Sequence, residues 1–179
     1  MLDRASDLRK SPDWLAQQWS DPDCQVLLLQ NDKNLMHWDR DQAPVAIYPL
    51  RQDIKALIDE INTVVFLGLN GTVPLFAAEI EISIEAYFGA QPYPKHNDHQ
   101  FIDVRALGCL LNAQDAAMLA YARGLLFWNR NSLFCGRCGM PTIQKQGGHA
   151  KHCSNESCGH LTFPRTDPAV IMLIEDYSN

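Results

Sequence analysis

The sequence predicts an α+β fold, in which a sheet with helices is followed by a small unit rich in cysteine. Three observations carry this prediction: short apolar runs between turn residues, two stretches with helical periodicity, and four cysteines gathered between positions 135 and 158. With 179 residues and 46% hydrophobic content, the chain can bury a substantial core. This length suits one main domain with a small appendage.

Short apolar runs in the first half of the chain predict strands joined by turns. Polar residues at 31–33 and Pro44 interrupt the first three runs, as turns would. Asn70-Gly71 separates the last two runs and predicts a hairpin with a type I′ turn, in which both central residues take positive φ. Pro74 lacks an N–H group, which indicates an edge strand. The predicted strands are residues 24–30, 34–38, 45–50, 63–69 and 72–84.

Two stretches have the periodicity of helices. Residues 52–61 place their isoleucine and leucine side chains on one side. A longer helix is predicted to begin after Asn112, which acts as its N-cap, with Asp115 three residues on. It runs almost directly into the cysteine-rich unit, so we expect that unit to be docked on the main domain. The apolar stripe of this helix consists of Met118, Tyr121, Ala122, Leu125 and Trp128.

Two close pairs of cysteines dominate the second half of the chain. They are Cys135, Cys138, Cys153 and Cys158. Zinc prefers four soft ligands, and each pair can turn both sulfurs toward one point, so the spacing predicts a zinc ribbon. Gly139 and Gly159 follow the two pairs and can supply the positive φ that closes such turns. Four cysteines leave no coordination position for water, and the metal is therefore expected to be structural.

Other cysteines and histidines leave alternatives open. A Cys-x-x-Cys pair can also be a redox dithiol, although that interpretation needs a thioredoxin-like strand and helix around it. Three nearby histidines could substitute as ligands but are more typical of solvated loop residues. Outside the cluster, Cys24 and Cys109 are interpreted as free buried thiols. The three histidines are His149, His152 and His160.

Charge and termini indicate the class of protein. Residues 1–7 are charged and contain no apolar run, so neither a signal peptide nor a membrane span is predicted, and a reducing, cytoplasmic location is expected. Residues 116–179 contain 6 Lys and Arg against 4 Asp and Glu, whereas the net charge of the whole chain is −6. This mild excess falls short of the dense basic patch of a nonspecific nucleic-acid binder. A solvated surface or attraction of a phosphate-bearing ligand would explain it.

Three segments carry a resemblance to a known family. They are residues 122–128 (ARGLLFW), residues 134–139 (FCGRCG) with the second cysteine pair, and residues 163–171 (FPRTDPAVI). Together they resemble the NADH pyrophosphatase family of Nudix hydrolases. The resemblance implies a rudimentary Nudix-like mixed sheet with helices over residues 1–132 and a zinc ribbon over 133–162. Residues 163–179 would be the opening strand of a truncated catalytic Nudix domain, because 169–174 read as a strand buried on both faces.

The resemblance also implies an activity. Members hydrolyse the pyrophosphate linkage of NAD(H) to nicotinamide mononucleotide and AMP, and related members remove NAD caps from RNA. Their Nudix box holds Mg²⁺ or Mn²⁺ against the diphosphate through several carboxylates. This sequence contains no Arg-Glu dipeptide and therefore no Nudix box. Glu79 and Glu81 alternate as strand residues do and are interpreted as solvent-facing, so this chain alone is expected to lack catalysis.

Two substrate-side residues and a partner follow from the same resemblance. Arg105, in the pair Val104-Arg105, could clamp a phosphate, and Phe163 could pack on a ring or ribose. A surface arginine and a core phenylalanine are the simpler alternatives. The family forms homodimers with composite active sites, which implies self-association here. The expected ligand is NAD(H) or another dinucleotide, or NAD-capped RNA.

The sequence leaves three functions open. The first is the zinc-ribbon portion of an NAD(H) diphosphatase. The second is a noncatalytic zinc-ribbon module that binds protein or nucleic acid, which the missing Nudix box favours. The third is a thiol-redox protein, which tightly held zinc that protects all four thiols would exclude.

Overall fold

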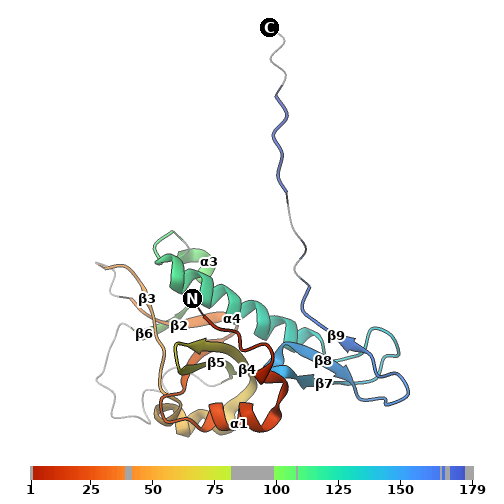
Figure 1. The fold of residues 1–179 in the computed structure, drawn as a ribbon. Coiled ribbons are helices and arrows are strands. Elements are labelled where there is room, and N and C mark those ends of the chain that lie inside the picture. The colour runs from red at the N-terminus through yellow and green to blue at the C-terminus, as the bar shows by residue number, and fades with distance from the viewer. Residues whose placement is uncertain are drawn as a thin grey trace.

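The computed structural model describes residues 2–38, 42–81, 99–107, 109–165, 167 and 170–175 (Figure 1). The main domain contains η1 (Leu8–Lys10), α1 (Pro12–Ser20), β1 (Gln25–Gln30), β2 (Lys33–His37), β3 (Val45–Ala46), η2 (Arg51–Glu60), β4 (Ile61–Asn70), β5 (Val73–Ile80), β6 (His99–Ile102), α3 (Val104–Leu107) and α4 (Ala113–Asn131). The ribbon contains β7 (Thr142–Lys145), η3 (Gln146–Gly148), β8 (Ala150–Cys153) and β9 (Leu161–Thr162).

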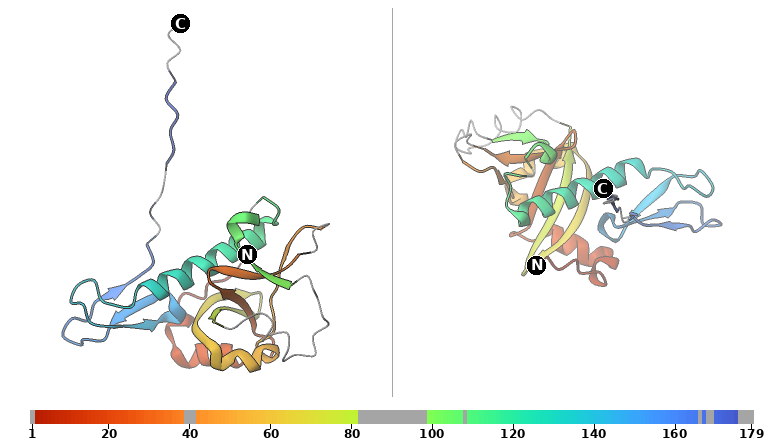
Figure 2. Two further views of the ribbon diagram at one scale, coloured as in Figure 1. Left: turned by 180° about the vertical axis from the view of Figure 1, so that it is seen from behind. Right: turned by 90° about the horizontal axis from the view of Figure 1, so that it is seen from above.

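Within these described residues, six strands form one mixed sheet in the main domain. The strand order is β3-β2-β1-β5-β4, and β6 also pairs with β2. The β1–β5 pair is parallel, whereas the others are antiparallel. A second, three-stranded sheet with the order β7-β8-β9 lies beside the end of α4 (Figure 2). The α+β class and the mixed sheet predicted from the sequence are therefore confirmed.

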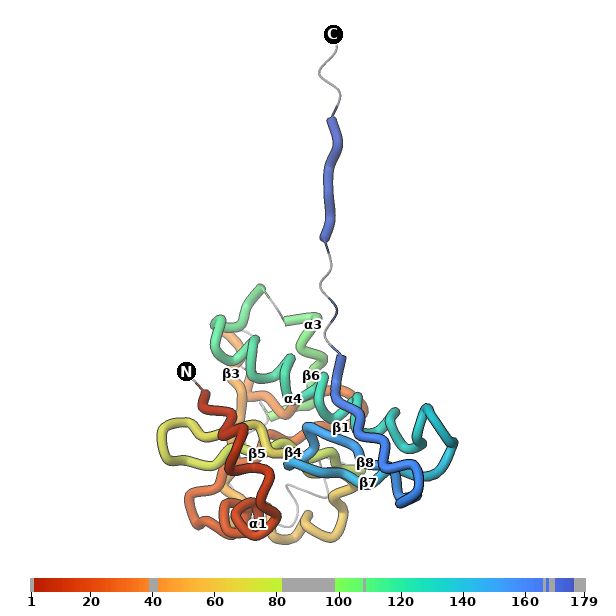
Figure 3. Tube along the Cα trace, turned by 45° about the vertical axis from the view of Figure 1, so that its right-hand side comes forward, coloured from red at the N-terminus to blue at the C-terminus, as the bar shows by residue number. Residues whose placement is uncertain are grey.

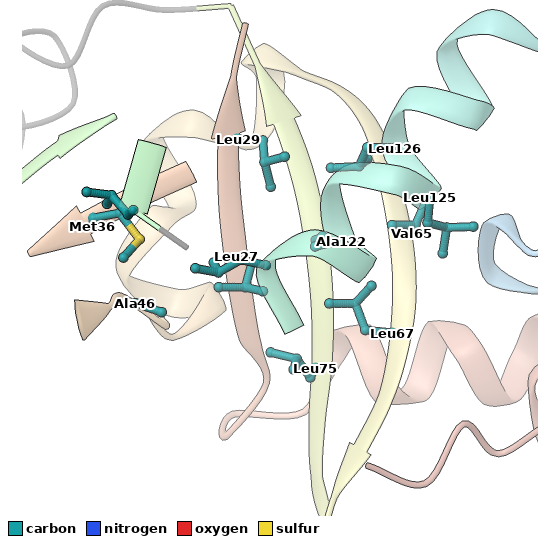
Figure 4. Close-up of a cluster of buried hydrophobic side chains, with 13 residues drawn as sticks. Leu27, Leu29, Met36, Ala46, Val65, Leu67, Leu75, Ala122, Leu125 and Leu126 are labelled. Atoms are coloured by element: carbon teal, nitrogen blue, oxygen red, sulfur yellow. The ribbon is translucent and has the colours of Figure 1, made fainter. Parts of the chain in front are cut away.

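Helices cover both faces of the main sheet, which explains the continuous apolar run in β1. Leu27 and Leu29 belong to a core beneath α4, drawn in Figure 4, while Val26 and Leu28 belong to a second core beneath α1 and η2. A strand alternates its side chains between two faces, so a strand covered on both sides must be apolar at every position. The main domain thus has three layers with β1 near its centre.

The predicted type I′ turn at Asn70-Gly71 and the predicted edge position of Pro74 were both wrong. The β4–β5 hairpin exists, but Asn70 pairs with Val73, so its loop is Gly71-Thr72, and of these residues only Gly71 has positive φ, at 63°. The two successive positive φ values that a type I′ turn requires occur instead in the β1–β2 turn, at Asn31 (φ 49°) and Asp32 (φ 61°). Pro74 lies on the interior strand β5, where it is tolerated because β1 begins to pair only at the following residue.

The long helix α4 confirms its predicted start. Asn112 is the N-cap, and its Oδ1 accepts a hydrogen bond from the backbone N–H of Asp115 at 2.9 Å. The Asp115 carboxylate in turn accepts a hydrogen bond from Tyr48 Oη at 2.8 Å, which ties the first turn to the sheet. The stripe residues Ala122 and Leu125 are buried, and the other three pack partly buried against the core. Along the described chain, no helix combines the length and apolar character needed to span a bilayer.

The shorter helices differ more from expectation. Residues 52–61 were predicted as a helix, and η2 occupies this region as a 3-10 helix that is interrupted at Ile54 (φ −103°). Helix α1 was not predicted, although Ser11 as N-cap followed by Pro12 at the first position is a typical helix start. Most of the polar loop at 91–99 and the end of the strand at 72–84 lie outside the described residues.

The apolar run near the C-terminal end does not form the predicted strand. Residues 170–174 are 78–100% exposed and extend away from the rest of the molecule beyond β9 (Figure 1). In the described part of the chain no strand pairs with them, and an isolated strand has no partner for its backbone hydrogen bonds. The proposed domain boundary at residue 163 stays a prediction.

Glu79 is buried, which corrects its interpretation as a solvent-facing residue. It lies on the face of β5 that α4 covers, and its carboxylate forms an ion pair with Arg130 of α4. Arg130 also pairs with Asp32 in the β1–β2 turn at 2.9 Å. The alternation of EIEISIE does not reveal this burial, because both faces of the sheet are covered. Glu81, in contrast, is exposed.

The ribbon is docked on β4 and α4, as predicted. Gln144 Nε2 donates to the Val64 carbonyl at 2.7 Å, and Asn129 Nδ2 donates to the Gly148 carbonyl at 2.8 Å. At Gly148, φ is +91°, and a Cβ atom there would lie 2.5 Å from Val65 Cγ1. The loop between β7 and β8 therefore meets the sheet with no room for a side chain.

We expect Gly148→Ala to destabilise the protein by about 2–3 kcal/mol, because it combines an unfavourable positive φ with overpacking against β4. Gly71→Ala is the matched control, since φ at Gly71 is +63° but no atom lies within 4 Å of the added Cβ. Urea unfolding of both variants gives the two free energies. Equal losses in the two variants would contradict tight docking of the ribbon.

Candidate metal centre and adjoining groove

The four predicted cysteine ligands converge. Their Sγ atoms all lie within 4.8 Å of one another. Cys138 Sγ is 3.4 Å from Cys153 Sγ, and Cys135 Sγ is 3.9 Å from Cys158 Sγ. A tetrahedral zinc ion with Zn–S bonds of about 2.3 Å places its ligands about 3.8 Å apart. The donor set and the spacing of the sulfurs therefore fit a structural zinc ion.

Tight turns in the ribbon create this convergence. Gly139 (φ 75°) and Gly159 (φ 55°) occupy the positive-φ positions predicted for them. In the first turn, Gly139 N donates to the Cys135 carbonyl at 2.8 Å, and Cys135 N donates to the Met140 carbonyl at 2.7 Å. A hydrogen bond from the backbone N–H of Arg137 is the main cause that lowers the pKa of Cys135 to about 7. Backbone groups are thus already placed to stabilise a thiolate ligand.

His149 is not a solvated loop residue, and it joins the ribbon to the sheet. Its side chain is buried, and its Nε2 lies 2.8 Å from the Phe66 carbonyl and 3.3 Å from Tyr121 Oη. The carbonyl can only accept, so Nε2 carries the ring hydrogen. Burial is the main cause that lowers the His149 pKa to about 4, so the ring is neutral at pH 7. His149 therefore docks the ribbon and stands outside the group of four convergent ligands.

The two substrate-side candidates lie on different parts of the molecule. Arg105 is in α3, where its exposed guanidinium forms an ion pair with Asp103 at 2.6 Å. Asp103 also pairs with Arg123 of α4 at 2.9 Å. Hydrogen bonds from Arg105 hold the pKa of the Asp103 carboxyl well below its usual range. Arg105 is a surface residue whose position is fixed by Asp103.

Phe163, in contrast, is half-exposed and lines a groove beside the ribbon. The groove has a volume of about 710 Å³ and is lined by residues of the N-terminal segment, α4 and the chain that leaves β9. Figure 3 traces the course of these three segments. Arg105 is not among its lining residues, so the structure does not bring the two candidates together in this groove. The sequence analysis missed Arg4 and Arg9, which line the groove from the N-terminal segment. No motif marks them, since they are two arginines five positions apart in a segment of mixed charge.

Comparison with known proteins gives the family. The model of the NADH pyrophosphatase-like rudimentary NUDIX domain matches residues 17–128, more than half of the chain. The chain belongs to the NADH pyrophosphatase family of Nudix hydrolases. The model of the NADH pyrophosphatase zinc ribbon domain matches residues 130–163, the region in which the four cysteines converge. Both domain types predicted from the sequence are thereby confirmed.

Individual relatives within this family cover different shares of the chain. The human NAD-capped RNA hydrolase NUDT12 is 30% identical over 209 residues, which covers 97% of this chain and 44% of the relative. Nudix hydrolase 19, chloroplastic, from Arabidopsis thaliana is 46% identical over 65 residues (36% of this chain, 15% of the relative). The NAD-capped RNA hydrolase NudC of Mycobacterium tuberculosis is 36% identical over 75 residues (42% of this chain, 23% of the relative). The chain spans less than half the length of these curated relatives.

Proposed function

We propose that this chain is the scaffold and substrate-side portion of a Nudix hydrolase that cleaves the pyrophosphate of NAD(H), giving nicotinamide mononucleotide and AMP. The proposed hydrolase would also act on NAD-capped RNA as a second substrate. The observation that carries it is the pairing of a rudimentary Nudix domain with a docked four-cysteine ribbon, which the family models match over residues 17–163 with a single-residue gap. The name of the human relative, an NAD-capped RNA hydrolase aligned over almost the whole chain, supports the choice of substrate.

In this proposal the chain supplies no catalytic group. Cleavage of a diphosphate needs Mg²⁺ or Mn²⁺ held by several carboxylates, and this sequence contains no Nudix box to hold them. Zinc bound by four cysteines has no open position for substrate or water and serves the fold. Arg105 and Phe163 are proposed to contact substrate, Arg105 through a phosphate and Phe163 through a ring.

Hydrolysis of NADH with Mn²⁺, measured as AMP release, tests the proposal. We expect activity from a longer form that includes a Nudix box and none from residues 1–179 alone. In the longer form, Arg105→Ala and Phe163→Ala are each expected to raise KM about tenfold, the effect of losing one charge-assisted hydrogen bond or stacking contact. Phe134→Ala is the matched control, because Phe134 is an exposed aromatic of the ribbon outside the groove. A longer form that binds zinc and Mn²⁺ but does not hydrolyse NADH would refute the proposal.

A noncatalytic zinc-ribbon module that binds protein or nucleic acid is the second candidate, and the closed metal site favours it. It predicts partners in pull-downs or salt-sensitive binding to RNA by a form that hydrolyses no dinucleotide. A thiol-redox function is disfavoured by the convergence of four sulfurs, since a dithiol needs only two. Homodimer formation and a cytoplasmic location also stay predictions, and the Arabidopsis relative is named as chloroplastic. Sedimentation and localisation of a tagged full-length protein would test them.

A further inference from the structure

The groove beside Phe163 has an unusual lining, which the proposed hydrolysis does not require. Three arginines line it: Arg4 and Arg9 from the N-terminal segment, and Arg165 from the chain that leaves β9. Among the described residues that line it, none is acidic, although acidic residues outnumber basic ones in the chain as a whole. An acidic protein thus places a local concentration of positive charge in one concave surface.

The two N-terminal arginines lack a compensating carboxylate. Within the described chain, no Asp or Glu oxygen forms an ion pair with Arg4 or Arg9, whereas Arg105, Arg123 and Arg130 each have such a partner. Arg9 Nη1 donates to the Arg4 carbonyl at 3.3 Å, and the buried Arg9 Nε has no hydrogen-bond partner among the described residues. Burial and the neighbouring Arg4 both lower the pKa of Arg9. An anion in the groove would satisfy both guanidinium groups.

Aromatic side chains line the same groove as the arginines. Tyr121 and Trp128 of α4 are partly buried against the core, and Phe163 is 49% exposed. The Arg4 guanidinium stacks 4.5 Å from the centroid of the Tyr121 ring, which holds it at the groove. Exposed rings beside cations are the surface on which nucleic-acid bases stack while their phosphates are neutralised. A volume of about 710 Å³ is within the range of pockets that hold a small organic ligand.

We propose that this arginine–aromatic groove binds a phosphate-bearing nucleotide, with Arg4, Arg9 and Arg165 on the phosphates and Phe163 or Trp128 against a base. The choice of probes rests on the proposed function, which offers two sources of this chemistry: a free dinucleotide, or the nucleotides of an RNA chain. Binding itself needs neither the Nudix box nor hydrolysis. A failure to bind nucleotides in the groove would therefore not contradict the proposed hydrolase function. A failure to hydrolyse NADH would likewise not contradict binding in the groove.

The experiment measures fluorescence anisotropy of a labelled single-stranded RNA of about ten nucleotides with the zinc-loaded 179-residue chain, with NADH as competitor. Arg4→Gln/Arg9→Gln is expected to weaken binding at least about tenfold and to lower the slope of log K against log salt by about 1.4, because two phosphate contacts are lost. Lys33→Gln/Lys55→Gln removes the same charge from exposed sites outside the groove and should change neither quantity. Arg165→Gln, at an 84% exposed side chain, repeats the test where misfolding is not expected.

The outcomes separate the sources and the alternatives. Displacement of the RNA by NADH would identify the dinucleotide as a ligand, and RNA binding that NADH does not displace would identify the RNA chain; both support the groove. If the arginine and lysine double variants weaken RNA binding equally, the proposal is overturned, because binding would then depend on the net charge of the protein and not on the groove. The proposal also fails if neither probe binds. It fails too if a longer form that contains a Nudix domain loses the binding, because other parts of that chain would then occupy the groove.

Discussion

Removal of zinc is expected to unfold residues 135–160 while the main sheet stays folded. The ribbon has few buried side chains of its own, chiefly Cys135, Ala150 and Cys153, and two of these belong to the group of four cysteines that could hold a metal ion. Zinc binding contributes about 10–16 kcal/mol to the folding of small metal domains, far more than this apolar core can supply. Without the ion, four sulfurs held within 4.8 Å have nothing to bind. The loss therefore includes the backbone hydrogen bonds of both cysteine turns.

Hydrogen exchange before and after chelation measures this effect. Amides of the two turns, such as Cys135 and Gly139, are expected to lose their protection, while those of β1 and β5 keep it. The edge strand β4 should show an intermediate loss, because it gives up contacts to Gln144 and His149. Cys153→Ser should reproduce the chelated state, and Cys109→Ser, at an exposed cysteine outside the cluster, should not. Unchanged protection in the ribbon would contradict a structural role for zinc.

The cysteine cluster could be predicted because it depends on short-range sequence. Spacing and following glycines determine how each pair of sulfurs turns, and both glycines have the expected φ. The capped start of α4 was predictable for the same reason, since Asn112 and Asp115 are three residues apart and satisfy each other's groups directly. Local signals of this kind require no knowledge of which elements later pack together.

The errors arose where packing over long sequence distances decides the environment. Glu79 looks exposed from its alternation, but α4 covers its face of the sheet and brings Arg130 from 51 residues away. Cys109 was expected to be buried beside its apolar neighbours, yet it is exposed. His149 looked like a loop residue, and the docking of the ribbon on β4 buries it 83 residues from Phe66. No periodic pattern in the sequence predicts these environments.

The groove depends both on a local sequence motif and on contacts between segments far apart in the sequence. Phe163 was marked by a family motif, but Arg4 and Arg9, which line the same groove, come from the N-terminal segment, and only the fold reveals that they share it. A bridge between Asp3 and Leu69 fixes this segment to β4, with reciprocal backbone hydrogen bonds of 2.9 and 2.7 Å. The position of Arg4 and Arg9 beside α4 thus depends on the edge of the rudimentary Nudix sheet, to which the N-terminal segment is bound.

Arg130→Met is expected to destabilise the protein by about 3 kcal/mol, because it leaves the buried Glu79 carboxylate without its cation. The methionine side chain retains most of the apolar stem, so the loss reports the charge and its hydrogen bonds. Urea unfolding at pH 7 measures the change. Arg105→Met is the matched control: its ion pair with Asp103 has a 75% exposed arginine, and solvent-exposed pairs contribute little to stability.

A double-mutant cycle with Glu79→Gln separates the pair from its surroundings. If the buried charge causes the loss, Arg130→Met should cost about 1 kcal/mol or less when Glu79 is already glutamine, because no uncompensated carboxylate remains. The residual cost then belongs to Asp32, whose carboxylate Arg130 also binds at 2.9 Å in the β1–β2 turn. An equal loss in both backgrounds would mean that Arg130 acts through packing or through Asp32 alone. The buried pair would then have no measurable role in holding α4 on the sheet.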